Sequence, residues 1–258
     1  MTGWEMLAVA AAGFAAGGIN AVVGSGTLVS FPVLLAVGLP PVPATISNSL
    51  GLIAGNLSGS IGYRRELRGQ RRLLLRLVPA SVLGALTGAF LLLHLPPSTF
   101  EAVVPVLIGI AVVLVAVQPA VQRRLPARTD ADSATPVRGG RLAALFAGAY
   151  ATGTYGGYFA ASQGVLQIGI FGLLLPESLQ RLNAIKNVLT MAVNAVAAIA
   201  YVIVAPDRVE WVAAALIAAG ALAGGFVGSS YGRRLPAPVL RAAIVVLGLT
   251  AIAVLLSR

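Results

Sequence analysis

Small and polar residues interrupt a long apolar stretch in each half of this sequence. In the first half, two glycines alternate with hydroxyl residues over positions 24–27, Gly-Ser-Gly-Thr. Within a membrane, irregular polar backbone persists only where protein buries it or where it lines a cavity. The N–H groups at the start of a helix after such a break, together with the positive end of the helix dipole, favour anions. The interruptions therefore predict an anion-binding site.

Candidate binding residues surround both interruptions and the start of the next apolar stretch. Those of the first half are Asn20, Gly24, Ser25, Gly26, Thr27, Thr45 and Asn48. Those of the second half are Tyr155, Gly156, Gly157, Gln163, Asn183, Lys186 and Asn187. For Gly24 and Gly26, an irregular turn is a better interpretation than simple helix packing, because the apolar stretch is too long for one span.

Lys186 is the only lysine in the chain and lies near the start of an apolar stretch. Asn183 and Asn187, four residues apart, flank it and share one helical face with each other. One interpretation makes Lys186 an inward-facing cation that neutralises a bound anion. The alternative is a lysine whose ammonium reaches the membrane interface while its aliphatic part stays in the apolar region.

Other chemistries find little support in the residue types. With no cysteine and His94 as the only histidine, the chain has no cluster for a metal, and we expect neither metal nor cofactor. The acidic residues all lie in loops or near span ends, which disfavours cation transport through buried carboxylates. We expect no enzyme, because Ser25 has only His94 to pair with and no spacing supports that pair.

The composition requires a lipid environment. Hydrophobic residues make up 58% of the 258 residues, charged residues 10%, and the mean hydropathy is +0.91. The net charge of +10 lies in short loops between apolar stretches, so we expect no nucleic-acid binding. Glu5 is the only charge near the N-terminus, which does not resemble a cleavable signal.

The apolar stretches predict an all-α polytopic membrane protein. Residues 5–38 are almost uncharged, but one helix of that length would be about 50 Å long, beyond one bilayer core. The stretch must therefore break near 24–27. The predicted segments are 5–23, 27–38, 42–62, 73–93, 100–119, 142–160, 164–175, 184–205, 210–231 and 238–257.

The order of segments repeats, which predicts a first repeat over 1–119, a cytoplasmic linker over 120–141 and a second repeat over 142–258. Gly84-x-x-x-Gly88 followed by Leu-Pro recurs as Gly224-x-x-x-Gly228 followed by Leu-Pro. Two-repeat folds are common among secondary transporters. The alternatives are chance matching between similar apolar stretches and glycines that serve only close helix packing.

Charge placement predicts that the two repeats are inverted. Arginine crowds the loop at 63–76 and is sparse near 206–210, whereas the next loop pair, 94–99 and 233–241, reverses this asymmetry. Since basic loops favour the cytoplasm, both termini are expected outside. Because each half begins and ends on opposite sides in this arrangement, each must cross the membrane an odd number of times. Five crossings satisfy this, and so does a re-entrant hairpin followed by three spans.

The two interrupted regions resemble the paired motifs of the TauE/SafE sulfite-exporter (TSUP) family of membrane permeases. The first is GGINAVVGSGTLVSFPVLLAVGLPPVPATISNSLG, and the second is TYGGYFAASQGVLQIGIFGLLLPESLQRLNAIKNVL. The resemblance covers nearly the whole chain. It implies an anion permease for sulfite or organosulfonates, with site residues in both motifs.

We therefore expect a secondary transporter for small anions, embedded in the lipid bilayer. The alternative is a membrane scaffold or partner subunit that transports nothing. The sequence leaves a homo-oligomer open.

Overall fold

A computed structural model describes residues 1–124, 139–231, 242, 244–250 and 252, which are helical apart from short connections. No strand occurs among them, which confirms the all-α class. The first half contains α1 Gly3–Val22, α2 Thr27–Ala36, α3 Pro41–Gly62, α4 Arg71–His94 and α5 Pro97–Arg124. The second contains α6 Gly140–Tyr158, α7 Gln163–Leu174, α8 Leu179–Val204, the 3₁₀ turn η2 Pro206–Arg208 and α9 Trp211–Tyr231. Most of the predicted segment 238–257 lies outside the described residues.

Five of the described helices are long and apolar enough to cross a bilayer: α1, α4, α5, α8 and α9. This confirms a multi-pass membrane protein. Helices α2 and α7, with 10 and 12 residues, are too short, because about 20 residues are needed to span the hydrocarbon core. Helix α3 has 22 residues, but many of its buried residues are polar.

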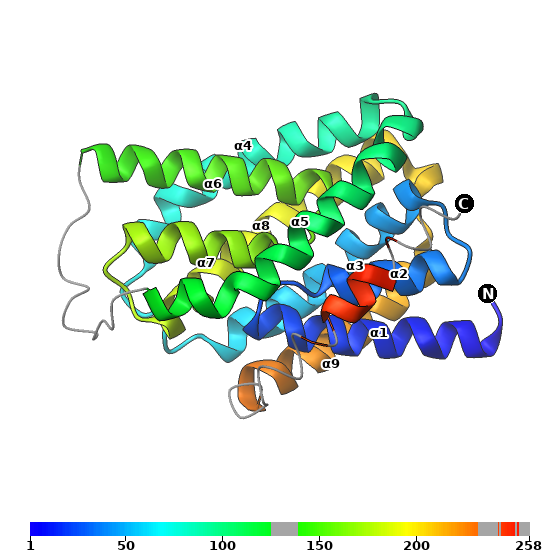
Figure 1. Ribbon diagram of the computed structural model, residues 1–258, viewed down its shortest axis with the longest axis horizontal. Helices are drawn as coiled ribbons and strands as arrows, with labels where there is room; N and C mark the ends of the chain where they lie inside the picture. Colours follow the sequence, from blue (N-terminus) through cyan, green and yellow to red (C-terminus); the bar gives the residue numbers. More distant parts are fainter. Residues whose placement is uncertain (125–138, 232–241, 243, 251, 253–258) are drawn as a thin grey trace.

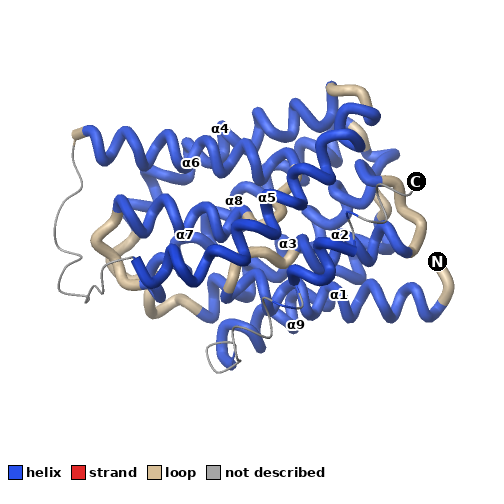
Figure 2. The backbone as a smooth tube through the Cα atoms, in the orientation of Figure 1, coloured by secondary structure: helices blue, strands red, loops and turns tan. Residues whose placement is uncertain are grey.

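The helices run along the long axis of the molecule, and most connections lie at its two ends (Figures 1 and 2). Helix α1 enters from the end that carries the N-terminus, and α2 turns back toward that same end (Figure 1). Helices α6 and α7 form a similar hairpin that opens to the opposite end (Figure 1). The number of crossings in each half, five or a re-entrant hairpin followed by three spans, stays a sequence-based prediction.

The first helix of each half packs against a late helix of the other half. Helix α1 lies along α9, and α6 lies along α4. An added Cβ at Gly84 or Gly88 would overlap the backbone of α6, and one at Gly224 or Gly228 would overlap the backbone of α1. These four glycines therefore serve close helix packing, the simpler of the interpretations that their spacing allowed.

Basic side chains gather at the end of the molecule where α6 begins. There the Nη2 of Arg181 donates a hydrogen bond of 3.2 Å to the Arg68 carbonyl, and the Nη2 of Arg141 donates one of 3.0 Å to the Leu174 carbonyl. The α3–α4 connection, the α7–α8 connection and the start of α6 thus meet at one end, which we call the basic end.

The opposite end, which carries the N-terminus, has acidic side chains. The amide of Glu210 donates a hydrogen bond of 2.8 Å to the Ser47 hydroxyl, which ties the start of α9 to α3. Glu5, Glu101 and Asp207 lie at this end too, in the first turn of α1, near the start of α5 and in η2. We call it the acidic end.

Some helix bounds differ from the sequence-based ones. Helix α8 begins at Leu179 rather than at 184, because its first turn is polar and is held by Arg181 at the basic end instead of lying in lipid. Helix α5 continues to Arg124 and α6 begins at Gly140, so both helices extend into the segment that the sequence predicted as linker.

Candidate functional site

The first break lies between α1 and α2. The amides of Val23 and Gly24 both donate to the Ile19 carbonyl, at 2.7 and 3.2 Å. The chain then leaves the helix at Gly24, whose φ of +89° is left-handed and favours glycine. The carbonyls of Asn20 and Ala21 consequently receive no backbone donor from the following turn, so they need other partners.

The second break, between α6 and α7, uses the same hydrogen-bond pattern. The amides of Phe159 and Ala160 both donate to the Tyr155 carbonyl, at 2.9 and 3.2 Å. Ala160 and Ser162 then adopt left-handed φ values of 63° and 58°, although neither is glycine. Such conformations cost about 1–3 kcal/mol each and persist where the surroundings enforce them.

The two breaks touch each other. The amide of Gly164 donates a hydrogen bond of 3.1 Å to the Gly24 carbonyl. A Cβ on Gly24 would lie 2.6 Å from the Gly164 Cα, and a Cβ on Gly164 would lie 2.6 Å from the Gly24 Cα. The same two positions are 3.2 and 2.8 Å from the Lys186 Cδ, so the lysine side chain passes directly beside the contact.

Lys186 is buried, with 1% of its surface exposed. Its Nζ donates to the Asn20 carbonyl at 2.8 Å and to the Ala21 carbonyl at 3.3 Å, and the Nδ2 of Asn187 also donates to Ala21, at 3.3 Å. Because the ammonium points into the protein at the end of α1, the interpretation of Lys186 as an interfacial lysine is wrong. The segment predicted from the sequence began at residue 184, whereas α8 begins at Leu179, so the prediction placed Lys186 too close to the start of its helix.

Several first-half candidates form one hydrogen-bonded group. The Asn48 side chain accepts from the Ser30 hydroxyl at 2.5 Å and donates to the Thr27 hydroxyl at 3.3 Å. The Asn20 Oδ1 accepts from the Gly26 amide at 3.4 Å, which holds the start of α2 against α1. The Thr45 hydroxyl instead bonds to the carbonyl of Pro41 in its own helix, so this contact does not link Thr45 to the group.

Other candidates carry buried polar atoms without a hydrogen-bond partner in the described structure. These atoms are the Ser25 hydroxyl, the Tyr155 hydroxyl, both amide atoms of Gln163, and the Oδ1 atoms of Asn183 and Asn187. A buried polar atom without a partner costs about 1–3 kcal/mol, so a bound group that supplies the partner would remove this cost. Ser25 and Gln163 directly flank the Gly24–Gly164 contact, so unpaired polar atoms border the touching breaks.

The two candidate glycines of the second half have packing contacts. An added Cβ at Gly156 would overlap the Gln163 amide, so this glycine makes room for that side chain. Gly157 lies against Ala85 of α4, and its carbonyl accepts a hydrogen bond from the Tyr201 hydroxyl. Gly157 thus belongs to the helix interface as well as to the end of α6.

The sequence reasoning missed polar residues one or two helical turns from its candidates. The Asn20 Nδ2 donates to the Asn56 Oδ1 at 2.5 Å, and the Thr190 hydroxyl donates to the Gln167 Oε1 at 3.0 Å. Thr190 follows Asn187 by three residues on the same face of α8. Helical periodicity could therefore have identified it.

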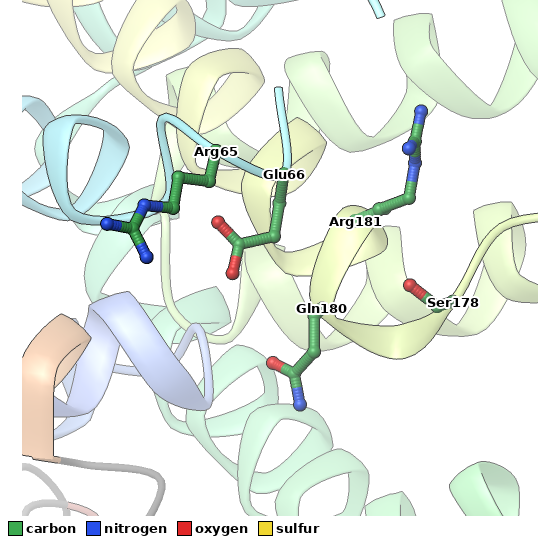
Figure 3. Close-up of a pocket in the computed structure, with 5 residues that line it drawn as sticks. All are labelled: Arg65, Glu66, Ser178, Gln180 and Arg181. Atoms are coloured by element: carbon green, nitrogen blue, oxygen red, sulfur yellow. The ribbon is translucent and has the colours of Figure 1, made fainter. Parts of the chain in front are cut away.

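A pocket of about 330 Å³ opens at the basic end (Figure 3). Its lining comes from the α3–α4 connection and the start of α8: Arg65, Glu66, Ser178, Gln180 and Arg181. Figure 3 shows the Arg181 guanidinium directed away from the Glu66 carboxylate. Along α8, Arg181 precedes Lys186 by about 7–8 Å of helix rise. The pocket therefore lies at the start of the helix that carries the buried lysine.

No group of three or more histidine, cysteine or acidic residues close enough to hold a metal occurs in the described part of the chain. The acidic residues described there lie near helix starts or in connections, and Glu66 and Glu177 lie in connections at the basic end. Around the touching breaks, Lys186 and the starts of α2 and α7 contribute positive potential, whereas the ends of α1 and α6 contribute negative potential.

Comparison with known proteins agrees with this architecture. Residues 9–255 match the family described as sulfite exporter TauE/SafE. The chain is 30% identical over 97 residues to a probable membrane transporter protein, ORF9, of Sinorhizobium sp.. It is 32% identical over 107 residues to a probable membrane transporter protein of Haemophilus influenzae.

These alignments cover 38% and 41% of this chain, and the chain spans only 37% and 42% of the two curated relatives. No solved structure gives a significant match. The names of the family and the relatives denote membrane transporters and not enzymes.

Proposed function

Because the chain belongs to the TauE/SafE sulfite exporter family of membrane transporters, we propose that it is a secondary permease for small anions, with sulfite or organosulfonates as substrates. The observation that carries this proposal is the contact between the two helix breaks at Gly24 and Gly164, beside the buried ammonium of Lys186. Three sources of positive potential meet there: the ammonium and the N-terminal ends of α2 and α7.

The physical argument rests on what a buried anion needs. Each helix start presents N–H groups that lack acceptors within the helix, and the helix dipole adds about half a positive charge. Short, broken helices that point their N-terminal ends at an anionic group are a recurring device in secondary transporters. An oxyanion with several acceptor oxygens, such as sulfite or a sulfonate, matches these donors.

We assign substrate contact first to the candidates with unpaired polar atoms near this point. The Ser25 hydroxyl and the Gln163 Nε2 flank the touching glycines and can donate to an anion. The unpaired atoms of Asn183 and Asn187 are oxygens, which accept, so these two residues would contact the anion through their Nδ2 groups. An anion that accepts hydrogen bonds from Ser25 and Gln163 removes the cost of leaving those groups unpaired. Among the other candidates, Asn20, Gly26, Thr27 and Asn48 hold the first break in place.

We propose that residues 1–119 and 142–258 are inverted repeats joined by a linker over 120–141. Two observations support this proposal. The first helix of each half packs on a late helix of the other half, α1 on α9 and α6 on α4, and the two hairpins open to opposite ends. We place the basic end in the cytoplasm and the N-terminus outside, because arginine-rich connections favour the cytoplasmic side. The outside location of the C-terminus stays a sequence-based prediction.

The pocket at the basic end fits this orientation as an entrance from the cytoplasm. Arg65 is exposed there, and the start of α8 forms the other wall. Anions approaching this end meet a positive potential before they reach Asn183 and Lys186 further along α8.

Counterflow in proteoliposomes tests the permease proposal. Purified protein should exchange labelled sulfite, sulfoacetate or taurine, and Lys186→Ala should reduce exchange at least about tenfold, since removing a charged partner costs 1.5–3 kcal/mol or more. Leu189→Ala, which removes a buried apolar side chain one turn further along α8, controls for packing loss.

A membrane scaffold predicts a different result. It neither exchanges these anions nor gains thermal stability in detergent when they are added. If both results hold and Lys186→Ala matches Leu189→Ala, the anion site should be abandoned.

A further inference from the structure

We propose, building on the permease function above, that the Lys186 ammonium takes the place of a coupling sodium ion at the C-terminal end of α1. The chain then binds its anion without an alkali cation. This goes beyond a counter-charge for the anion, because it assigns the ammonium a second site of its own, made of backbone carbonyls.

The end of α1 has the features of a cation site. The amides of Val23 and Gly24 both go to the Ile19 carbonyl, so the carbonyls of Asn20 and Ala21 point out of the helix without backbone donors. They also lie at the negative end of the α1 dipole. In transporters with broken helices, carbonyls at such ends coordinate the coupling cation.

In this chain the lysine fills that place. Its Nζ lies 2.8 Å from the Asn20 oxygen and 3.3 Å from the Ala21 oxygen. No carboxylate pairs with it in the part of the chain that the structure describes, so the carbonyls are its electrostatic partners there. The Asn187 side chain adds a donor to Ala21, while its own Oδ1 is buried and unpaired.

The second break shows that a charge is not needed simply to cap the end of a broken helix. At the end of α6, the Gly157 carbonyl accepts from the hydroxyl of Tyr201, a neutral donor. Both donors, Lys186 and Tyr201, come from α8. Of these two donors, only the one at the first break is charged. The charge therefore points to a role of the Lys186 ammonium in place of a cation, beyond giving the last carbonyls of α1 a hydrogen-bond donor.

Removing the lysine leaves an oxygen-lined space. The Asn20 and Ala21 carbonyls remain, and Asn187 can turn its amide so that Oδ1 joins them. Three oxygens and water suit a sodium ion, which prefers hard oxygen ligands. We therefore expect Lys186→Ala to bind sodium, whereas the unaltered protein does not.

Thermal unfolding in detergent, in sodium chloride and in choline chloride at equal ionic strength, is the experiment. In Lys186→Ala, sodium should raise Tm saturably by about 3–6 °C at a tenfold excess over its dissociation constant. The unaltered protein should show no sodium-specific shift. Leu189→Ala controls for an empty space in α8, and Tyr201→Phe controls for a carbonyl that has lost its donor.

Two outcomes overturn the inference: a sodium-specific shift in the unaltered protein, or no such shift in Lys186→Ala. If Lys186→Ala cannot be purified, Lys186→Ser serves, because its short side chain is neutral, leaves the space open and carries a hydroxyl oxygen. The same sodium shift is expected, and its absence is decisive. No substrate anion is present, so the result does not depend on transport. A permease that fails the counterflow test can still show the sodium shift, and the reverse also holds.

Discussion

The Gly164 amide donates a 3.1 Å hydrogen bond to the Gly24 carbonyl, which joins the two halves of the chain at their helix breaks. Neither glycine leaves room for a side chain, because backbone atoms of the other lie 2.6 Å from the position a Cβ would take. The Lys186 side chain passes beside both. Changes at this contact should therefore affect the proposed site directly.

Gly24→Ala should unfold more easily and lose most transport. Alanine at a φ of +89° costs about 1–2 kcal/mol, and its Cβ would in addition overlap the Gly164 backbone. Gly38→Ala is the matched control, because Gly38 has a φ of +90° but nothing within 4 Å of its Cβ position. Thermal unfolding and counterflow of both variants separate backbone strain from contact between the breaks. Equal behaviour of the two variants would show that the contact does not matter.

The interface glycines should affect stability without affecting substrate affinity. In Gly88→Ala the new methyl group would overlap the Thr154 carbonyl and push α4 away from α6, at a cost of about 1–3 kcal/mol. Gly109→Ala is the control, because no atom lies within 4 Å of its Cβ position. This change should leave the stability of the protein unchanged or raise it slightly. The measurement is Tm together with KM for the exchanged anion. A large rise in KM for Gly88→Ala at unchanged Tm would place this glycine in the site instead.

Much of the fold could be predicted, because apolar length and glycine breaks are properties of local sequence. The start of α8 could not, since its polar first turn is stabilised by a contact from Arg181 to Arg68, far away in the chain. The same limit applies to Lys186: only tertiary packing decides whether a lysine near a span end points to the interface or to a carbonyl of α1. Spacing located the two breaks, but it could not show that they touch.

Cysteine labelling tests the orientation, and the chain suits it because it contains no cysteine. Arg64→Cys and Gln180→Cys, both exposed at the basic end, should react with a membrane-impermeant maleimide only from the cytoplasmic side. Glu101→Cys and Asp207→Cys, exposed at the acidic end, should react only from outside. Intact cells expose the outer side of the membrane to the reagent, and inside-out vesicles expose the cytoplasmic side. Labelling of 64 and 180 from opposite sides would contradict the shared basic end and, with it, the inverted repeats.

Gln163 and Gln167 offer the sharpest separation of binding from folding. Both are fully buried on α7. Neither amide atom of Gln163 has a partner in the described structure, whereas the Gln167 Oε1 accepts from the Thr190 hydroxyl and only its Nε2 is unpaired. Gln163→Met keeps an unbranched side chain and removes unpaired polar atoms, so the free energy of unfolding should stay equal or rise by about 1 kcal/mol.

If the Gln163 amide contacts the anion, the same change should reduce counterflow at least about tenfold, the loss expected for a hydrogen bond to a charged group. Gln167→Met should instead destabilise the protein by about 1–3 kcal/mol, because it leaves the Thr190 hydroxyl buried without its partner. Measuring the free energy of unfolding and the counterflow rate of both variants shows whether Gln163 acts in binding or in folding. Normal transport by Gln163→Met would remove Gln163 from the proposed site, since no loss of folding could mask the result.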